Sequence, residues 1–82
     1  MKLALVSDGN DFAIYDDAAW KVGKAKKLAM LNRNQADFTI VAAEGAPATL
    51  PSGAFQTFND ALIALREAGF AFEQYEKQLW SN

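Results

Sequence analysis

Alternating apolar and polar positions at the start of the chain predict a β-hairpin. Residues 2–7 and 12–16 form two short apolar-rich runs, and the turn-forming sequence Ser7-Asp8-Gly9-Asn10-Asp11 separates them. Because side chains alternate between the two faces of a strand, large apolar residues of both runs should share one face. These residues are Leu3, Leu5, Phe12 and Ile14.

The next segment has the spacing of a helix. Asp16 or Asp17 is a suitable N-cap, and the apolar spacing predicts a helix that runs to about Asn32 and ends at Asn34 in a left-handed conformation. Gly23 would lie inside this helix at a cost of up to ~1 kcal/mol relative to alanine. The buried stripe would consist mainly of small residues: Ala18, Val22, Ala25, Leu28 and Ala29.

The second half of the chain predicts further strands and a second helix. Residues 37–43 alternate as a third strand, residues 48–50 form a short fourth strand, and residues 70–75 form the last one. A helix should run from about residue 58 to residue 68, between an N-cap at Thr57 and a stop at Gly69. Residues 76–80 fit a strand or a helix equally well.

These elements predict one α+β domain over residues 1–82, in the order ββαβ(β)αβ. The expected sheet is mostly antiparallel, and we expect both helices to cover the same face. The predicted core consists of apolar residues from the strands and the second helix: Leu5, Ile14, Phe38, Ile40, Phe58, Leu62, Leu65 and Phe72.

Composition restricts the chemistry that this chain can perform. Hydrophobic residues make up 51% of the 82 residues, which supports a packed core. The sequence contains neither cysteine nor histidine, so it lacks thiolate ligands, disulfides and the usual general base. It also lacks a glycine-rich phosphate loop. We therefore expect no enzyme activity, no cofactor and no transition-metal site.

No segment has the length of a signal sequence core or of a membrane span. The sequence therefore predicts a soluble cytoplasmic protein with no membrane partner.

Positive charge is concentrated in one stretch of a chain whose net charge is −2. Five of the eight Lys and Arg residues lie in residues 21–33, which contain no acidic residue, whereas the flanking segments are acidic overall. A basic helix face that includes an aromatic residue can bind an acidic protein or a nucleic acid. The alternative is a solvated helix whose tryptophan packs on a neighbouring loop. The candidate binding residues here are Trp20, Lys21, Lys24, Lys27 and Leu31.

The second face of the predicted sheet is also a candidate surface, because it is apolar. Its residues are Val6, Ala13, Tyr15, Thr39, Val41 and Tyr75. This face could be covered by a partner protein, by a second copy of the chain, or by the C-terminal segment with Leu79 and Trp80. Of these residues, we take Tyr15, Val41 and Tyr75 as candidate contacts.

The acidic hairpin is a further candidate site. Asp8, Asn10 and Asp11 present oxygen atoms that could hold Ca²⁺ or Mg²⁺, but they lack the spacing of an EF-hand loop. Turn formation is the simpler explanation of these residues.

The sequence therefore predicts a non-catalytic protein that binds another macromolecule. A protein partner is favoured, as for an adaptor or for an inhibitor of the kind that mobile elements encode, although this last step rests on analogy. The first alternative is an accessory protein that binds nucleic acid through basic helix 21–33. The second alternative is a small metal-binding protein or enzyme that uses the acidic hairpin.

Overall fold

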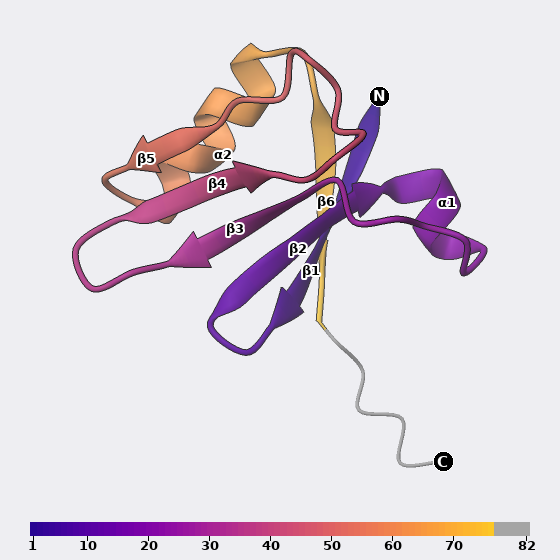
Figure 1. Cartoon of the computed structure of the whole chain (residues 1–82), viewed down its shortest axis with the longest axis horizontal. Coiled ribbons are helices and arrows are strands. Elements are labelled where there is room, and N and C mark those ends of the chain that lie inside the picture. The colour runs from indigo at the N-terminus through magenta and orange to yellow at the C-terminus, as the bar shows by residue number, and fades with distance from the viewer. Residues whose placement is uncertain (77–82) are drawn as a thin grey trace.

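The computed structural model describes residues 1–76, and these residues form one six-stranded sheet and two helices (Figure 1). The strand order is β5-β4-β3-β2-β1-β6, and only β1 and β6 run parallel to each other. The predicted α+β domain with a mostly antiparallel sheet is confirmed. The elements are β1 (Lys2–Asp8), β2 (Asp11–Asp16), α1 (Asp17–Lys21), β3 (Ala29–Arg33), β4 (Phe38–Ala42), β5 (Gly53–Phe55), α2 (Phe58–Glu67) and β6 (Ala71–Tyr75).

Strands β1 and β2 form the predicted hairpin. Leu5 pairs with Ile14 and Asp8 pairs with Asp11, so the turn consists of Gly9 and Asn10. Gly9 has a φ of 66°, a left-handed conformation that glycine adopts without steric cost. Both Leu5 and Ile14 are fully buried, as the alternation predicts.

Helix α1 is much shorter than the sequence predicts. Asp16 caps it by accepting a hydrogen bond from the amide of Ala19 at 3.0 Å, but the helix ends at Lys21. Gly23 has a φ of 72° and donates to the carbonyl of Trp20, while Lys24 donates to the carbonyl of Ala19. This pair of bonds is a Schellman motif. Gly23 therefore ends the helix, and the helix predicted through residue 32 was wrong.

Residues 29–33 are a strand in the middle of the sheet. Strand β3 pairs antiparallel with β2 on one side and with β4 on the other. Leu31 lies opposite both Phe12 and Ile40 and is fully buried. Asn34 has a negative φ and starts a turn, donating its backbone amide to the carbonyl of Asp37 at 2.9 Å. Sheet pairing on both sides therefore replaces the helix that local spacing favoured.

The predicted short strand at residues 48–50 was also wrong. These residues lie in a turn, in which the amide of Leu50 donates to the carbonyl of Pro47 at 3.0 Å. The edge strand β5 follows instead, and Phe55 pairs with Phe38 of β4.

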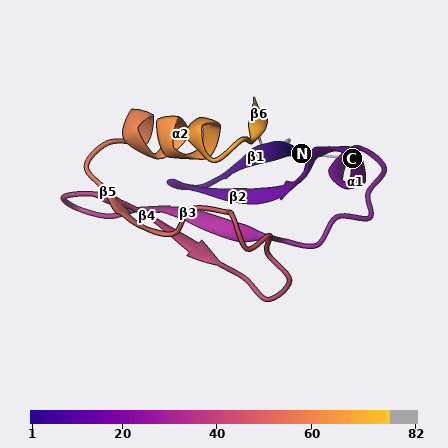
Figure 2. The same ribbon diagram turned by 90° about the horizontal axis from the view of Figure 1, so that it is seen from above.

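Helix α2 matches its prediction closely. The hydroxyl of Thr57 accepts a hydrogen bond from the amide of Asp60 at 3.0 Å, which caps the N-terminus. Gly69, with a φ of 94°, ends the helix in a second Schellman motif. The helix contacts β4, β5 and β6, and Figure 2 shows it against one side of the twisted sheet. It therefore spans from one edge of the sheet to the other.

The core lies between α2 and this face of the sheet. Of the eight predicted core residues, Leu5, Ile14, Ile40 and Leu65 are fully buried or nearly so. The other four are partly buried against the core: Phe38, Phe58, Leu62 and Phe72. The remaining buried core residues are Leu3, Ala29, Leu31, Leu50, Ala61 and Phe70.

Helix α1 does not share this face. Its side chains contact Lys2 and Tyr75. The register places Tyr75 beside Val6, whose side chain points to the side opposite Leu5. The two expected helices are present, but only α2 covers the core face, whereas α1 contacts side chains that project from the other face.

No helix among the described residues is long and apolar enough to cross a membrane. Residues 77–80 lie outside the described residues, so the structure does not test whether the segment 76–80 is a strand or a helix. Leu79 and Trp80, which we expected to cover the second face of the sheet, also lie outside them.

Candidate functional site

Trp20 and Tyr75 form an aromatic pair that joins α1 to β6. Their ring centroids are 4.4 Å apart, with an angle of 35° between the ring planes. Trp20 belongs to α1, and Tyr75 is the last residue of β6. Both side chains are half-buried. The structure therefore brings together two predicted contact residues that came from two separate candidate surfaces.

A buried carboxylate holds this pair in place. Asp17 is only 4% exposed, and it accepts a hydrogen bond from the Tyr75 hydroxyl at 2.8 Å. The same carboxylate lies 3.1 Å from the ammonium of Lys21 and 3.8 Å from that of Lys2. A buried charge needs such partners, because burial removes its hydration. Asp17 therefore connects α1 to both β1 and β6.

The ionisation of Asp17 and Tyr75 reflects this arrangement. Burial alone would raise the pKa of Asp17, but hydrogen bonds from Tyr75 and Lys21 and two nearby positive charges hold the pKa below its usual value. Burial and the hydrogen bond to Asp17 raise the pKa of Tyr75 well above its ordinary value. At neutral pH the site therefore contains a charged carboxylate and a neutral phenol.

Lys2 and Glu73 complete the cluster at the surface. The ammonium of Lys2 donates to the Glu73 carboxylate at 2.8 Å. This hydrogen bond lowers the pKa of Glu73 and raises that of Lys2. With Asp17 and Lys21, the cluster contains two positive and two negative groups and is electrically balanced.

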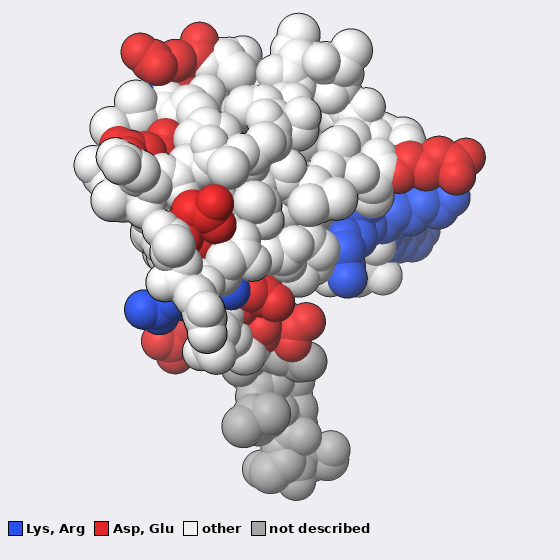
Figure 3. All heavy atoms as spheres, turned by 60° about the vertical axis from the view of Figure 1, so that its left-hand side comes forward, with Lys and Arg blue, Asp and Glu red and all other residues white. Residues whose placement is uncertain are grey.

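The unbalanced positive charge lies in the lysine loop, residues 22–28, which follows α1. Lys24, Lys26 and Lys27 are exposed, and no ion pair within the described part of the chain involves them. Figure 3 shows basic side chains gathered at one side of the molecule, next to a group of acidic ones. The basic surface is therefore a loop beside the Trp20–Tyr75 pair, and not a helix face.

Three other predicted contact residues lie elsewhere. Leu31 is fully buried on the α2 face of the sheet, so its expected place on a basic surface was wrong. Tyr15 is half-buried and Val41 is 55% exposed, and both project from the other face. On that face Val6 and Ala13 are already buried, so only part of the expected apolar surface is open.

The acidic hairpin is arranged as a turn. Asp8 and Asp11 face each other across the two strands, and one Asp11 oxygen accepts a hydrogen bond from the amide of Arg33 at 2.9 Å. Residues 1–76 contain no group of three His, Cys, Asp or Glu residues arranged to hold a metal ion.

Sequence reasoning missed the roles of Asp17, Lys2 and Glu73. One signal was present: Asp16 and Asp17 are adjacent and only one carboxylate is needed as the N-cap, which leaves the other for a different role. Its partner Tyr75 is 58 residues away, a pairing that local pattern does not specify. Comparisons of the chain with protein-family models, curated proteins and solved structures found no match.

Proposed function

We propose that this chain is a non-catalytic protein-binding module that contacts an acidic partner protein through Trp20 and the lysine loop. The observation that carries the proposal is the exposure of Lys24, Lys26 and Lys27 beside an aromatic pair, without an ion pair in the described part of the chain. Charge that is not used within the fold is available to a partner.

The aromatic pair supports this proposal because it is held in advance of binding. Trp20 packs against Tyr75 with the two rings tilted, and the Tyr75 hydroxyl donates a hydrogen bond to buried Asp17. Tryptophan is enriched among the residues that dominate binding energy, and a side chain that is already ordered loses less entropy on association. Trp20 would supply affinity, and the lysines would orient and accelerate the encounter.

The overall charge of the molecule favours a protein over a nucleic acid. The net charge is −2, and the segments on both sides of the basic stretch are acidic. A long polyanion would meet these repulsive charges, whereas a protein with one local acidic patch would not. An adaptor or an inhibitor would act in this way by occupying its partner's surface.

The test is charge reversal in the loop, Lys24→Glu with Lys27→Glu. A partner captured from the source cell and identified by mass spectrometry should bind the double variant more weakly, mainly through slower association. The melting temperature should stay the same, because surface charge changes usually alter stability by less than ~0.5 kcal/mol. The matched control is Arg33→Glu with Arg66→Glu, which changes the net charge equally at other exposed positions.

Two outcomes would contradict the proposal. Full affinity of the Lys24→Glu, Lys27→Glu variant would remove the lysine loop from the interface. Binding of a DNA or RNA oligonucleotide, with an affinity that falls log-linearly with salt, would instead indicate the nucleic-acid alternative.

A further inference from the structure

A pocket of about 500 Å³ opens at the end of the sheet that contains the β1–β2 turn. This volume is in the range of sites that hold small molecules, roughly 300–1,000 Å³. The lysine loop follows α1, which begins at the opposite end of β2, so this pocket lies apart from the loop and shares only Tyr75 with the aromatic pair. Its lining comes from four strands and the segments next to them: Ser7, Gly9, Asn10, Phe12, Arg33, Gln74, Tyr75 and Glu76.

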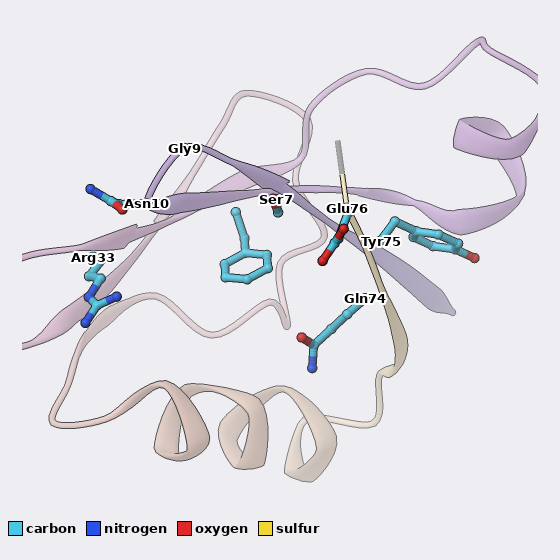
Figure 4. Close-up of a pocket in the computed structure, with 8 residues that line it drawn as sticks. Ser7, Gly9, Asn10, Arg33, Gln74, Tyr75 and Glu76 are labelled. Carbon is cyan, nitrogen blue, oxygen red and sulfur yellow. The ribbon is translucent and has the colours of Figure 1, made fainter. Parts of the chain in front are cut away.

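An aromatic side chain gives the pocket a rigid apolar wall. Phe12 pairs with Ser7 across the hairpin, and its ring stacks on Phe58 of α2 with the centroids 5.0 Å apart. Gln74 pairs with Leu5, so it projects from the same face as Phe12. The ring of Tyr75 points away from the pocket, toward α1 (Figure 4). The open space therefore has one apolar wall and several polar groups around it.

Opposite charges occupy opposite sides of this pocket. Figure 4 shows Arg33 on one side and Gln74 and Glu76 on the other. Arg33 ends β3 and Glu76 follows β6, so two strands separate them in the sheet. Among residues 1–76, no ion pair involves the Arg33 guanidinium or the Glu76 carboxylate. The Arg33 guanidinium lies 6.0 Å from the centroid of the Phe38 ring, a contact with the ring face that leaves its N–H groups able to bond a carboxylate.

The spacing of the strands sets the length of that ligand. Three strand intervals at about 4.8 Å each place the two backbones roughly 14 Å apart. Arg33 and Glu76 both line the space between these backbones. An extended chain spans about 3.3–3.6 Å per residue, so a peptide of two or more residues fits an interval of this size better than a single amino acid.

We propose that this pocket binds a short zwitterionic peptide of about two residues. Its carboxylate pairs with Arg33, whose planar guanidinium forms two parallel hydrogen bonds to such a group. Its ammonium pairs with Glu76, and an apolar side chain packs against Phe12. The side-chain amide of Gln74 lies on the same side as Glu76, where its carbonyl oxygen can accept a hydrogen bond from the ammonium end of the peptide.

The test is an NMR titration of the ¹⁵N-labelled protein with the dipeptide Ala-Phe. Saturable shifts should occur at Ser7, Phe12 and Gln74. N-acetyl-Ala-Phe-amide, which has neither charge, should bind roughly tenfold or more weakly, because each charge-assisted hydrogen bond contributes at least this factor. Arg33→Gln and Glu76→Gln should each weaken Ala-Phe binding by a similar factor.

Two matched variants control for general charge effects. Arg66→Gln and Glu67→Gln change the same residue types on the exposed surface of α2 and should leave the titration unchanged. The proposal is overturned if Ala-Phe causes no saturable shift at millimolar concentration, if the blocked peptide binds equally well, or if Arg33→Gln binds like the parent. All four substituted residues are exposed, so melting curves should confirm that each variant folds.

Discussion

Replacing Leu31 with alanine should cost a large part of the stability of this domain. Leu31 is fully buried in β3, and its neighbours across the strands are Phe12 and Ile40. Because β3 is hydrogen-bonded on both sides, the sheet has little freedom to close the cavity that the substitution leaves. We therefore expect a loss of about 3–5 kcal/mol, the upper part of the range for buried leucines.

The stability lost in Leu31→Ala is large in comparison with the total free energy of unfolding of the domain. A chain of 82 residues has roughly 4–12 kcal/mol of folding free energy at typical values per residue. Urea unfolding followed by circular dichroism measures the difference directly, as a lower midpoint with an unchanged slope. The melting temperature should fall by more than about 10 °C.

The control for this experiment is Ile63→Ala on α2. Ile63 is 41% exposed, so its truncation should change the free energy of unfolding by no more than about 0.5 kcal/mol. If Leu31→Ala unfolds at the same urea concentration as the parent, Leu31 does not lie in the core and β3 is not a central strand. That result would also support the sequence-based prediction that Leu31 lies on the basic binding surface.

Three further predictions concern the ends of the helices and the buried carboxylate. Gly23→Ala should destabilise the protein by about 1–2 kcal/mol, because its φ of 72° is left-handed, whereas in a continuous helix the same change would stabilise. Thr57→Ala should cost about 1 kcal/mol in thermal melts by removing the N-cap of α2, and no loss would contradict that role. Tyr75→Phe should lower the melting temperature most at neutral pH. Asp17 has a lowered pKa, so its contribution is complete above the ordinary value of 3.8 and is lost as pH falls through the folded value. The gap between parent and Tyr75→Phe should narrow in acid, and an equal narrowing with Tyr15→Phe would refute the assignment.

Local signals were sufficient where the sequence contained explicit starts and stops. The hairpin follows from alternation around the Asp8–Asp11 turn, and α2 follows from Thr57 and Gly69. The helix predicted for the segment from Val22 to Arg33 was wrong because the small residues of this segment fit helical spacing as well as strand alternation. Pairing with strands on both sides decides its structure, and the φ of Gly23 is visible only in the fold.

The candidate site was predictable only in part, for a similar reason. The cluster of lysines is apparent from the sequence itself, and the exposure of these residues follows from their charge. The contact of Trp20 and Asp17 with Tyr75 depends on the parallel placement of β6 beside β1. Parallel pairing leaves no turn sequence between the strands, so no local signal marks it.

The pairing of β1 with β6 also has a consequence for synthesis on the ribosome. β1 and β2 can form their hairpin early, but the other edge of β1 stays open until β6 emerges, and Lys2 lies 71 residues before its partner Glu73. At typical translation rates this delay is on the order of seconds, far longer than a hairpin needs to form. During that interval the nascent chain presents an apolar strand edge at Leu3 and Leu5, which makes it a substrate for chaperones and for mispairing. Completion of the sheet, and with it the assembly of the Asp17–Tyr75 contact, must therefore wait until almost the whole described chain has been made.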